Sequence, residues 1–600
     1  MISPSRIAWW FCTTLLLVVA WWYYPQQQSG RTSPVLAWDA SGYYLYLPAV
    51  FIHHDLRELN FRDQLINDYG PTPQFDQAFR HPGSGNFVMK YPAGLALQEL
   101  PFFLTAHALA KPLDYPADGF SPPYQWAIKL GGLLASVLSL WLVRRALLPR
   151  FGEWPTALTL VFLVLGTNYL AYSGAGQAGM THCWLFGWYA VLLLLTPAFY
   201  ARPTWARALG IGAVVGIMVL TRPTEILAVL LPLLWGLKPT LAAVRERIGF
   251  WQQRWSLLLG AVMAGGVLVS IQLFYWHYAS GDWIVYSYQD QGFSWLKPHL
   301  WDGIFSFRSG WLMYSPLLLT ALVGFGPLRQ QAPDAFWAML VYTVLFIYVT
   351  FAWDEWTYGG ALGQRAMIQS YAVLAWPMAG ALKWLGARPR WALAYAPLAV
   401  LGCAYGYWLT QMAQPGGLLV AGDMNRTYLR RILFRYQVPP ETKLLIDSNS
   451  EFTGTARNRR VIWQQDFEQP APGLCGTPAL QGACSLALNS QHPQSQEWVL
   501  PARPGQFKWL RAYAEARTDA QEWDMFRMTE YMVRFRRGNE VVKTRAARFQ
   551  RVLEAGWPRE LYFDMRPPTE EFDNICISFI HKGTTANVVF DNARLEAFDD

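Results

Sequence analysis

Charged residues are scarce in this chain. They make up 15% of its 600 residues, whereas 53% are hydrophobic, and the mean hydropathy is +0.12. Soluble globular proteins carry roughly a quarter of charged residues. The composition therefore excludes an ordinary soluble globule and predicts a polytopic α-helical membrane protein.

Two kinds of motif are also missing. The six cysteines have no spacing that is typical of a zinc site, and no glycine-rich loop follows the pattern that holds nucleotide phosphates. We therefore expect no zinc site and no bound nucleotide. The formal net charge of +8 is explained by basic loops at the membrane and does not indicate a nucleic-acid partner.

Cysteine is rare, and its positions divide into two groups. Cys12, Cys183 and Cys403 lie in apolar runs, where we expect small buried side chains. Cys475 and Cys484 lie close together in a loop rich in glycine and proline, and Cys576 is left over. If that part of the chain is in an oxidising compartment, a disulfide between Cys475 and Cys484 is predicted.

Long apolar runs are abundant. A helix of about 17–25 residues crosses the hydrocarbon core of a bilayer, and eleven such runs occur, at approximately 7–24, 126–143, 155–173, 181–199, 208–221, 224–237, 256–275, 311–327, 334–352, 366–383 and 391–409. The two short runs on either side of Thr221-Arg222-Pro223 could instead form one broken or hairpinned unit.

The basic residues of the short loops predict the orientation, because lysine and arginine are retained on the cytoplasmic side. With the N-terminus inside, the basic loop residues fall on one side: Arg6, Arg144, Arg145, Arg150, Arg202, Arg207, Lys238, Arg245, Arg247, Arg254, Arg329, Lys383, Arg388 and Arg390. The outer side then receives residues 25–125, 174–180, 276–310, 353–365 and everything after 410. The apolar segment 93–110 would invert this pattern if it crossed, so we expect an interfacial or re-entrant helix there.

The composition changes from about residue 411. Charge rises, long apolar runs end, and short alternating stretches lie between turn residues. This pattern predicts an antiparallel β-sandwich. We expect a transmembrane domain at 1–410 with a large first outer loop at 25–125, a connector at 411–459 and a soluble β-domain at 460–600.

The outer loops combine aromatic residues with ionisable ones, which are costly near membrane depth and often mark a site or a paired contact. The candidates are Asp39, Lys90, His182, Arg222, Asp290, Arg308, Asp354, Glu355 and Arg365.

These residues lie in motifs whose order resembles a known family. The motifs are WDASGYY at 38–44, KYPAG at 90–94, MTH at 180–182, LTRPT at 220–224, FSFRSG at 305–310 with YSPLL at 314–318, and YGGALGQR at 358–365. Over roughly residues 1–410, this series resembles the GT-C superfamily of integral-membrane glycosyltransferases, near the protein O-mannosyltransferases and the lipid A aminoarabinose transferases. The resemblance implies a sugar donor linked to a polyprenyl phosphate.

The resemblance also implies roles for individual residues. Asp39, beside Tyr43 and Tyr44, would act as the general base on the acceptor hydroxyl or orient it; the first task suits a carboxylate if burial raises its proton affinity. An alternative is that Asp39 caps the helix beginning near Ala40-Ser41. Lys90 would stabilise the departing phosphate, unless it is an ordinary lysine that extends to the membrane surface.

The remaining candidates have two interpretations each. Arg365 would grip the donor phosphate or sugar, or form a structural ion pair with Asp354 or Glu355; Arg222 and Arg308 are weaker phosphate candidates. His182 could donate to a sugar or phosphate or bind a divalent ion with Asp39, but a hydrogen-bonded histidine at a helix end is the simpler interpretation. Several better-known relatives have two adjacent acids in the first loop, whereas Asp39 is followed by Ala40. Some relatives need a metal and others do not; because the sequence shows no dense carboxylate cluster, we expect no metal requirement.

The sequence thus predicts a glycosyltransferase of the bacterial inner membrane that moves a sugar to a glycan, lipid or protein acceptor on the outer face, with a periplasmic C-terminal domain. That domain, from 461–468 to 589–596, resembles a jelly-roll carbohydrate-binding module, whose rings would stack on sugars or form the core. The alternatives are a transporter or flippase of lipid-linked sugars, which should show internal repeats, and a non-catalytic membrane protein that binds glycans.

Overall fold

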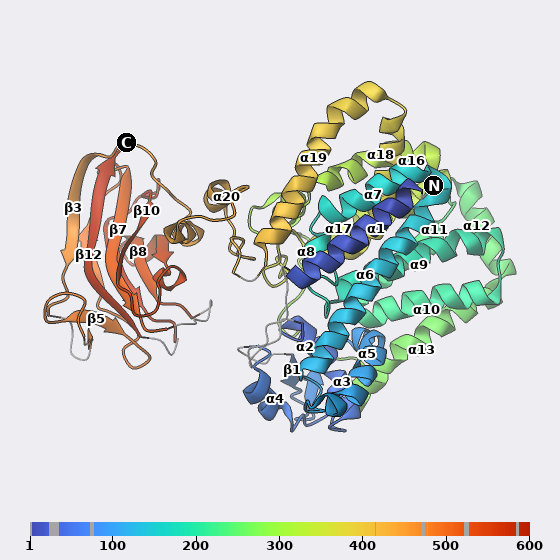
Figure 1. Ribbon diagram of the computed structural model, residues 1–600, viewed down its shortest axis with the longest axis horizontal. Helices are drawn as coiled ribbons and strands as arrows, with labels where there is room; N and C mark the ends of the chain where they lie inside the picture. Colours follow the sequence, from blue (N-terminus) through green and yellow to red (C-terminus); the bar gives the residue numbers. More distant parts are fainter. Residues whose placement is uncertain are drawn as a thin grey trace. The chain divides into compact units, whose positions relative to one another are not determined.

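The computed structural model describes residues 3–22, 35–72, 77–414, 416–469, 474–476, 478–520, 527–583 and 587–600. The chain divides into two compact units, Met1–Gly422 and Asp423–Asp600. The first unit is helical and the second is built from strands (Figure 1).

The first unit contains the apolar helices. Its elements are α1 Pro4–Trp22, α2 Asp39–Tyr44, α3 Tyr46–Phe51, α4 Arg62–Tyr69, β1 Ala78–Arg80, β2 Phe87–Met89, α5 Gly94–Ala110, η1 Lys111–Leu113, α6 Pro122–Phe151, α7 Glu153–Leu165, α8 Tyr169–Tyr172, α9 Thr181–Ala201, α10 Trp205–Thr221, η2 Pro223–Val229, α11 Leu230–Leu234, α12 Leu241–Gln253, α13 Trp255–Ser280, α14 Leu300–Phe305, α15 Trp311–Tyr314, η3 Pro316–Leu318, α16 Leu319–Gln331, α17 Pro333–Ala352, η4 Arg365–Ser370, α18 Tyr371–Gly386 and α19 Pro389–Met412.

Six helices among the described residues, α1, α6, α9, α13, α17 and α19, are long and apolar enough to cross a membrane. In α13 only 6% of the most apolar stretch is buried within the protein, so lipid must cover the rest. The chain is an integral membrane protein. The other expected spans fall on shorter or interrupted elements, such as α10 followed by η2 and α11, so the count of eleven stays a prediction.

The loops of the first unit form two separate groups. At one end Arg150 makes a bidentate pair with Asp334, at 2.7 and 2.5 Å, and Lys383 donates to the carbonyl of Arg150 at 2.8 Å. Loops predicted for the opposite side supply the Asp39 cluster described below.

The second unit is a sandwich of two antiparallel sheets. One sheet has the order β10-β7-β12-β5-β4, with β3 paired to β12, and the other has the order β6-β11-β8-β9. The elements are α20 Arg426–Ile432, η5 Pro440–Leu444, α21 Leu445–Ser448, β3 Arg457–Gln465, β4 Cys475–Gly476, β5 Ser485–Leu488, β6 Trp498–Pro501, β7 Trp509–Thr518, β8 Glu530–Arg537, β9 Glu540–Ala547, η6 Phe549–Arg551, β10 Arg559–Met565, β11 Asn574–Ile580 and β12 Val588–Asp599.

The core of this unit lies between its sheets. Phe579 of β11 packs on Phe590 of β12 with ring centroids 4.6 Å apart, and buried Leu510 and Ala512 alternate with outward residues along β7. The unit begins earlier than the expected β-domain, because Asp423 pairs with Arg551 at 2.6 Å. Residues 423–456 of the expected connector therefore belong with the sandwich.

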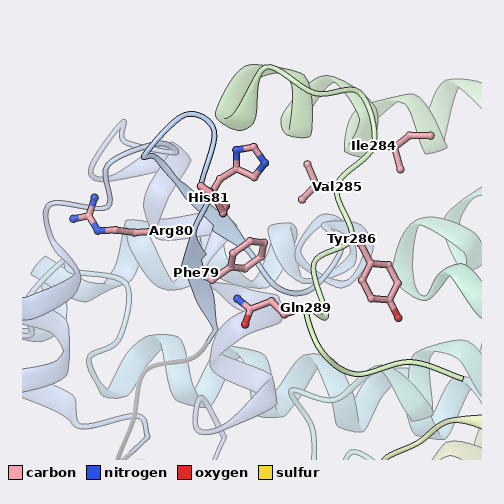
Figure 2. A pocket seen from close by; sticks show the side chains of 8 residues that line it. Phe79, Arg80, His81, Ile284, Val285, Tyr286 and Gln289 are labelled. Atoms are coloured by element: carbon pink, nitrogen blue, oxygen red, sulfur yellow. The ribbon is translucent and has the colours of Figure 1, made fainter.

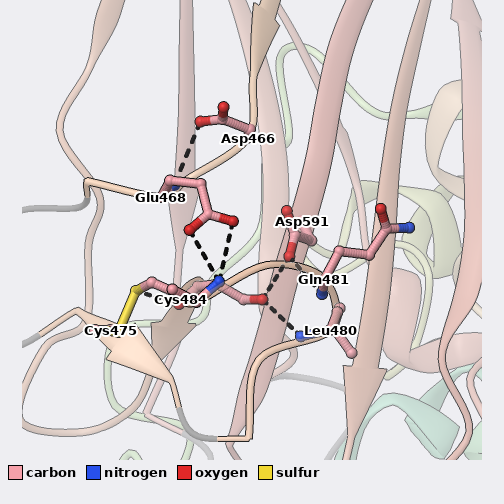
Figure 3. Close-up of a disulfide and its surroundings, with 9 residues drawn as sticks. Asp466, Glu468, Cys475, Leu480, Gln481, Cys484 and Asp591 are labelled. Carbon is pink, nitrogen blue, oxygen red and sulfur yellow. Dashed lines mark hydrogen bonds between the residues drawn. A yellow bond between two sulfur atoms is a disulfide. The ribbon is translucent and has the colours of Figure 1, made fainter.

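The predicted disulfide is present. Cys475 and Cys484 are bonded, with Cα atoms 5.4 Å apart, beside the start of β5 (Figure 3). Glu468 accepts from the backbone N–H of Ala483, at 3.0 Å to Oε2, and a Cβ on Gly482 would overlap the Glu468 carboxylate. Glycine is therefore required at 482, where φ is +62°. Cys576 is a free, buried thiol on β11, in a strand as expected.

Candidate active site

Asp39 is the first residue of α2, directly after a strained turn. Trp38 has φ +52°, a left-handed conformation that is costly for a residue other than glycine. Because α2 begins at Asp39 itself, this residue is not the cap of the helix. Its carboxylate accepts from the Tyr91 hydroxyl at 2.8 Å and pairs with the guanidinium of Arg365. The Asp39 side chain is 29% exposed, so it is only partly accessible to solvent.

Arg365 reaches Asp39 from a left-handed loop. Gly359, Gly360 and Gly363 all have positive φ, between +66° and +78°, and a Cβ on Gly363 would lie 2.4 Å from the Cβ of Tyr314. These glycines let the loop turn closely enough to start η4 at Arg365. The alternative ion pair with Asp354 or Glu355 is not formed: Asp354 accepts from the Gly292 amide and the Ser294 hydroxyl, and Glu355 from the Thr357 hydroxyl.

The charge state of Asp39 differs from the expectation. Burial by itself raises the pKa of Asp39, but the positive charge of Arg365, the hydrogen bonds from Tyr91 and Arg365, and the charge of Lys90 outweigh it, so the pKa is lowered from its usual value. The raised proton affinity that would suit a general base is therefore absent, because these partners outweigh the effect of burial. In this structure Asp39 is a well-stabilised carboxylate.

Tyrosine rings surround the carboxylate. Tyr43 stacks on Tyr91 with centroids 4.4 Å apart, and Tyr288 meets Tyr91 edge-on at 6.1 Å. Burial raises the pKa of Tyr91, which keeps the proton that it donates to Asp39. A Cβ on Gly42 would lie 2.6 Å from the Tyr91 ring, so glycine is needed for this close approach.

Two further cations lie near the ion pair of Asp39 and Arg365. The Lys90 ammonium is 6.0 Å from the centroid of Tyr91 and acts electrostatically on Asp39. The Arg222 guanidinium lies 5.8 Å from the centroid of Tyr358 and interacts electrostatically with Tyr43, Tyr358, Glu225 and Tyr288. Among the described residues Arg222 has no hydrogen bond from its side chain.

Several predicted residues do not join this cluster. Tyr44 is fully buried and donates to the carbonyl of Gly119 at 2.6 Å, in the core against Phe103. Arg308 donates from Nε to the carbonyl of Gly422 at 2.7 Å, a structural contact. Asp354 and Glu355 are exposed; Asp354 is bonded to the segment at 292–294, and Glu355 to its own loop at Thr357. Within the described ranges, no group of three or more His, Cys, Asp and Glu side chains is arranged for a metal ion.

His182 lies next to the cluster in a buried network. Its Nδ1 is 3.1 Å from Oε1 of Gln369, and Nε2 of Gln369 donates to Glu225 at 3.0 Å. Glu225 also accepts from the hydroxyl of Tyr189. Both Arg222 and Arg365 act electrostatically on the His182 ring.

Sequence reasoning missed several of these residues. Tyr91 lies in the KYPAG motif and Tyr358 in the YGGALGQR motif, but neither was among the predicted site residues. Tyr288 and Gln369 lie in none of the motifs. Glu225 could have been found, because an acid in an apolar run is costly unless it has a partner.

A separate pocket of about 370 Å³ lies between residues 79–82 and the segment 284–289. Figure 2 shows that Phe79, Arg80 and His81 line it from one side, and Ile284, Val285, Tyr286 and Gln289 from the other. Tyr288 lies between Tyr286 and Gln289 in the sequence and contacts Tyr91.

Comparison with known proteins gives only distant matches. No protein-family profile and no curated protein matches the sequence. Among solved structures, the chain is similar to ArnT from Cupriavidus metallidurans bound to undecaprenyl phosphate, at 14% identity and a TM-score of 0.37 over 65% of this chain and 62% of that one. It is similar to arabinosyltransferase EmbB from Mycobacterium smegmatis at 11% identity and a TM-score of 0.37, over 100% of this chain and 65% of that one.

Both matches have a TM-score of 0.37 and an identity of 14% or less, so they assign no family to this chain. The matched part is less than two thirds of either structure's own length. At this distance the matches do not assign a reaction.

Proposed function

We propose that this protein is a glycosyltransferase that moves a sugar from a polyprenyl-phosphate donor to an acceptor hydroxyl at Asp39. One observation carries the proposal: a single accessible carboxylate, paired with Arg365, lies near two further cations, Lys90 and Arg222, among tyrosine rings. Cations in excess over carboxylate favour an anionic ligand, and the aromatic rings offer stacking surfaces for a sugar.

The proposed reaction is a direct displacement. The acceptor oxygen attacks the anomeric carbon, its proton passes to Asp39, and the bond from the anomeric carbon to the phosphate oxygen breaks. The polyprenyl phosphate leaves with the bonding electron pair. Lys90 and Arg222 stabilise the negative charge that develops on it.

The ion pair with Arg365 gives this reaction a control step. While Arg365 holds Asp39, the carboxylate is a weak base, because its pKa is lowered. A donor phosphate would compete for the guanidinium, since both oxyanions suit its fork. Moving Arg365 to the phosphate would then raise the basicity of Asp39 only when donor is bound.

The setting of this reaction follows from the predicted orientation. We propose that the cluster lies on the outer face of a bacterial inner membrane, that the acceptor is a glycan, lipid or protein, and that the C-terminal domain is a periplasmic, jelly-roll-like module that binds glycan. In that domain Trp557 and Tyr562 are exposed, whereas Trp509 is buried. The exposed pair is the candidate for stacking on sugars.

The decisive experiment follows donor cleavage. Protein in nanodiscs is mixed with radiolabelled undecaprenyl phosphate sugars and an extract of bacterial membrane glycans and lipids, and release of undecaprenyl phosphate is measured. The wild-type protein should release it, and Asp39→Asn should not, while still binding the lipid. Movement of the intact lipid between leaflets without cleavage would instead identify a flippase.

A further inference from the structure

His182 has one ring nitrogen held in place and the other unused. The side chain is 2% exposed, Nδ1 faces Oε1 of Gln369 at 3.1 Å, and Nε2 is buried without a partner among the described residues. Buried polar atoms without partners are uncommon and call for an explanation, such as a missing ligand group.

The neighbours of His182 determine which nitrogen carries the proton. An amide side chain donates only from its nitrogen and accepts only at its oxygen. Gln369 uses Nε2 to donate to the carboxylate of Glu225 at 3.0 Å, so it presents Oε1 to the imidazole. Nδ1 of His182 must then carry the proton, and in a neutral ring Nε2 is an acceptor.

The charges nearby favour the neutral ring. Arg222 and Arg365 both act on the imidazole, and a second ring proton would place a third positive charge beside them. Glu225 is the one acid in this network, and it already accepts from Gln369 and from the hydroxyl of Tyr189. It does not contact the ring, which touches Gln369 instead.

We infer that His182 recognises the sugar of the donor, accepting at Nε2 a hydrogen bond from a sugar hydroxyl. This inference rests on the proposed function. A phosphodiester has no proton to donate to Nε2, whereas a sugar hydroxyl has one. His182 is therefore a specificity-determining residue for the sugar and does not bind the phosphate. Gln369 connects this residue to the reacting carboxylate, because η4 begins with Arg365, the partner of Asp39.

The test compares bare undecaprenyl phosphate with the same lipid carrying a sugar. Binding of undecaprenyl phosphate and of undecaprenyl phosphate carrying a pentose or a hexose is measured for the protein in nanodiscs. His182→Leu should weaken binding of one glycosylated lipid about ten- to a hundredfold, the usual effect of leaving a buried hydrogen-bonding group unpaired. Binding of the bare lipid should not change. His182→Gln, which places an amide oxygen near the position of Nε2, should restore most of the loss.

Two results would overturn this assignment. An equal loss for both lipids would show a phosphate contact or a purely structural role, and no loss for either would show that His182 does not touch the donor. If the wild-type protein binds neither glycosylated lipid, the proposed function fails and the sugar assignment fails with it.

A second measurement judges the histidine without any substrate. In protein with ¹⁵N-labelled histidine, the signal that disappears in His182→Leu reports the protonation of this ring. A neutral ring with the proton on Nδ1 is expected at neutral pH. In Gln369→Leu the proton should no longer prefer Nδ1 over Nε2. A proton on Nε2, or a doubly protonated ring, would overturn the inference even if the lipids bind.

Discussion

The guanidinium of Arg365 pairs with the carboxylate of Asp39 across 326 positions of the sequence. The pair joins the first outer loop to the loop before α18, and it lowers the pKa of Asp39. A carboxylate held in this way is ready to bind a proton only after its partner moves.

Replacing Asp39 with asparagine should abolish sugar transfer. Removal of a general base usually costs about a hundredfold to ten-thousandfold in rate, and the amide keeps the size of the side chain. Release of undecaprenyl phosphate from labelled donor measures the effect. Asp354→Asn is the matched control, because the hydrogen bonds of that exposed acid go to Gly292 and Ser294 and not to the Asp39 cluster, and an equal loss in both variants would contradict the role of Asp39.

The stability that Asp39 contributes should depend on pH in one direction. Because the pKa of Asp39 is lowered in the folded protein from 3.8, the contribution is fully present above the pKa of the unfolded state. It is lost as the pH falls through the folded pKa. The difference in thermal midpoint between the wild type and Asp39→Asn should be constant above about pH 5 and shrink below about pH 4. A wild type that gains stability relative to Asp39→Asn as the pH falls from 7 to 5 would instead indicate a raised pKa.

Arg222→Gln should weaken binding of the donor phosphate. The guanidinium has no hydrogen-bond partner of its own among the described residues, so its donors are available to an anion. Loss of a charged hydrogen bond typically weakens binding by about tenfold to a hundredfold. Binding of undecaprenyl phosphate should fall while that of undecaprenol stays the same. Arg308→Gln should have little effect, since Arg308 is bound to the carbonyl of Gly422.

Gly42→Ala should disturb the site by displacing Tyr91. The added methyl group would lie 2.6 Å from the Tyr91 ring, so Tyr91 must move away from Asp39, and overpacking of this kind costs about 1–3 kcal/mol. We expect a lower thermal midpoint and transfer reduced by roughly tenfold or more. Gly249→Ala in α12 is the control, because a Cβ there meets nothing within 4 Å. Unchanged transfer in Gly42→Ala would show that Tyr91 is dispensable.

Removing the disulfide should destabilise the C-terminal unit alone. A bridge that closes a loop with a sequence separation of 9 contributes about 2–3 kcal/mol in the chain-entropy description. Cys475→Ser with Cys484→Ser should therefore unfold the sandwich earlier in denaturant. The unfolding of the helical unit should not change. Cys576→Ser, which removes a free thiol, separates loss of the bridge from loss of a cysteine.

The sequence by itself determined the class of the protein, the types of its secondary structure and several of its charged residues and cysteines. Long apolar runs require helices in a membrane because no water is available there to satisfy the backbone, and period-two alternation requires strands. The positions of Asp39, Lys90, Arg222 and Arg365 were predicted because charges beside apolar segments are costly. The Cys475–Cys484 bridge followed from proximity along the chain.

Only the tertiary structure decided how these residues are paired. The partner of Arg365 is Asp39 and not the nearer Asp354 or Glu355, because the left-handed turns at Gly359, Gly360 and Gly363 lead the chain back toward α2. The side chains of Tyr43 and Tyr44 leave α2 in different directions, so Tyr43 lies in the cluster and Tyr44 in the core. The pKa of Asp39 depends on charges brought from distant loops, and no local pattern carries that information.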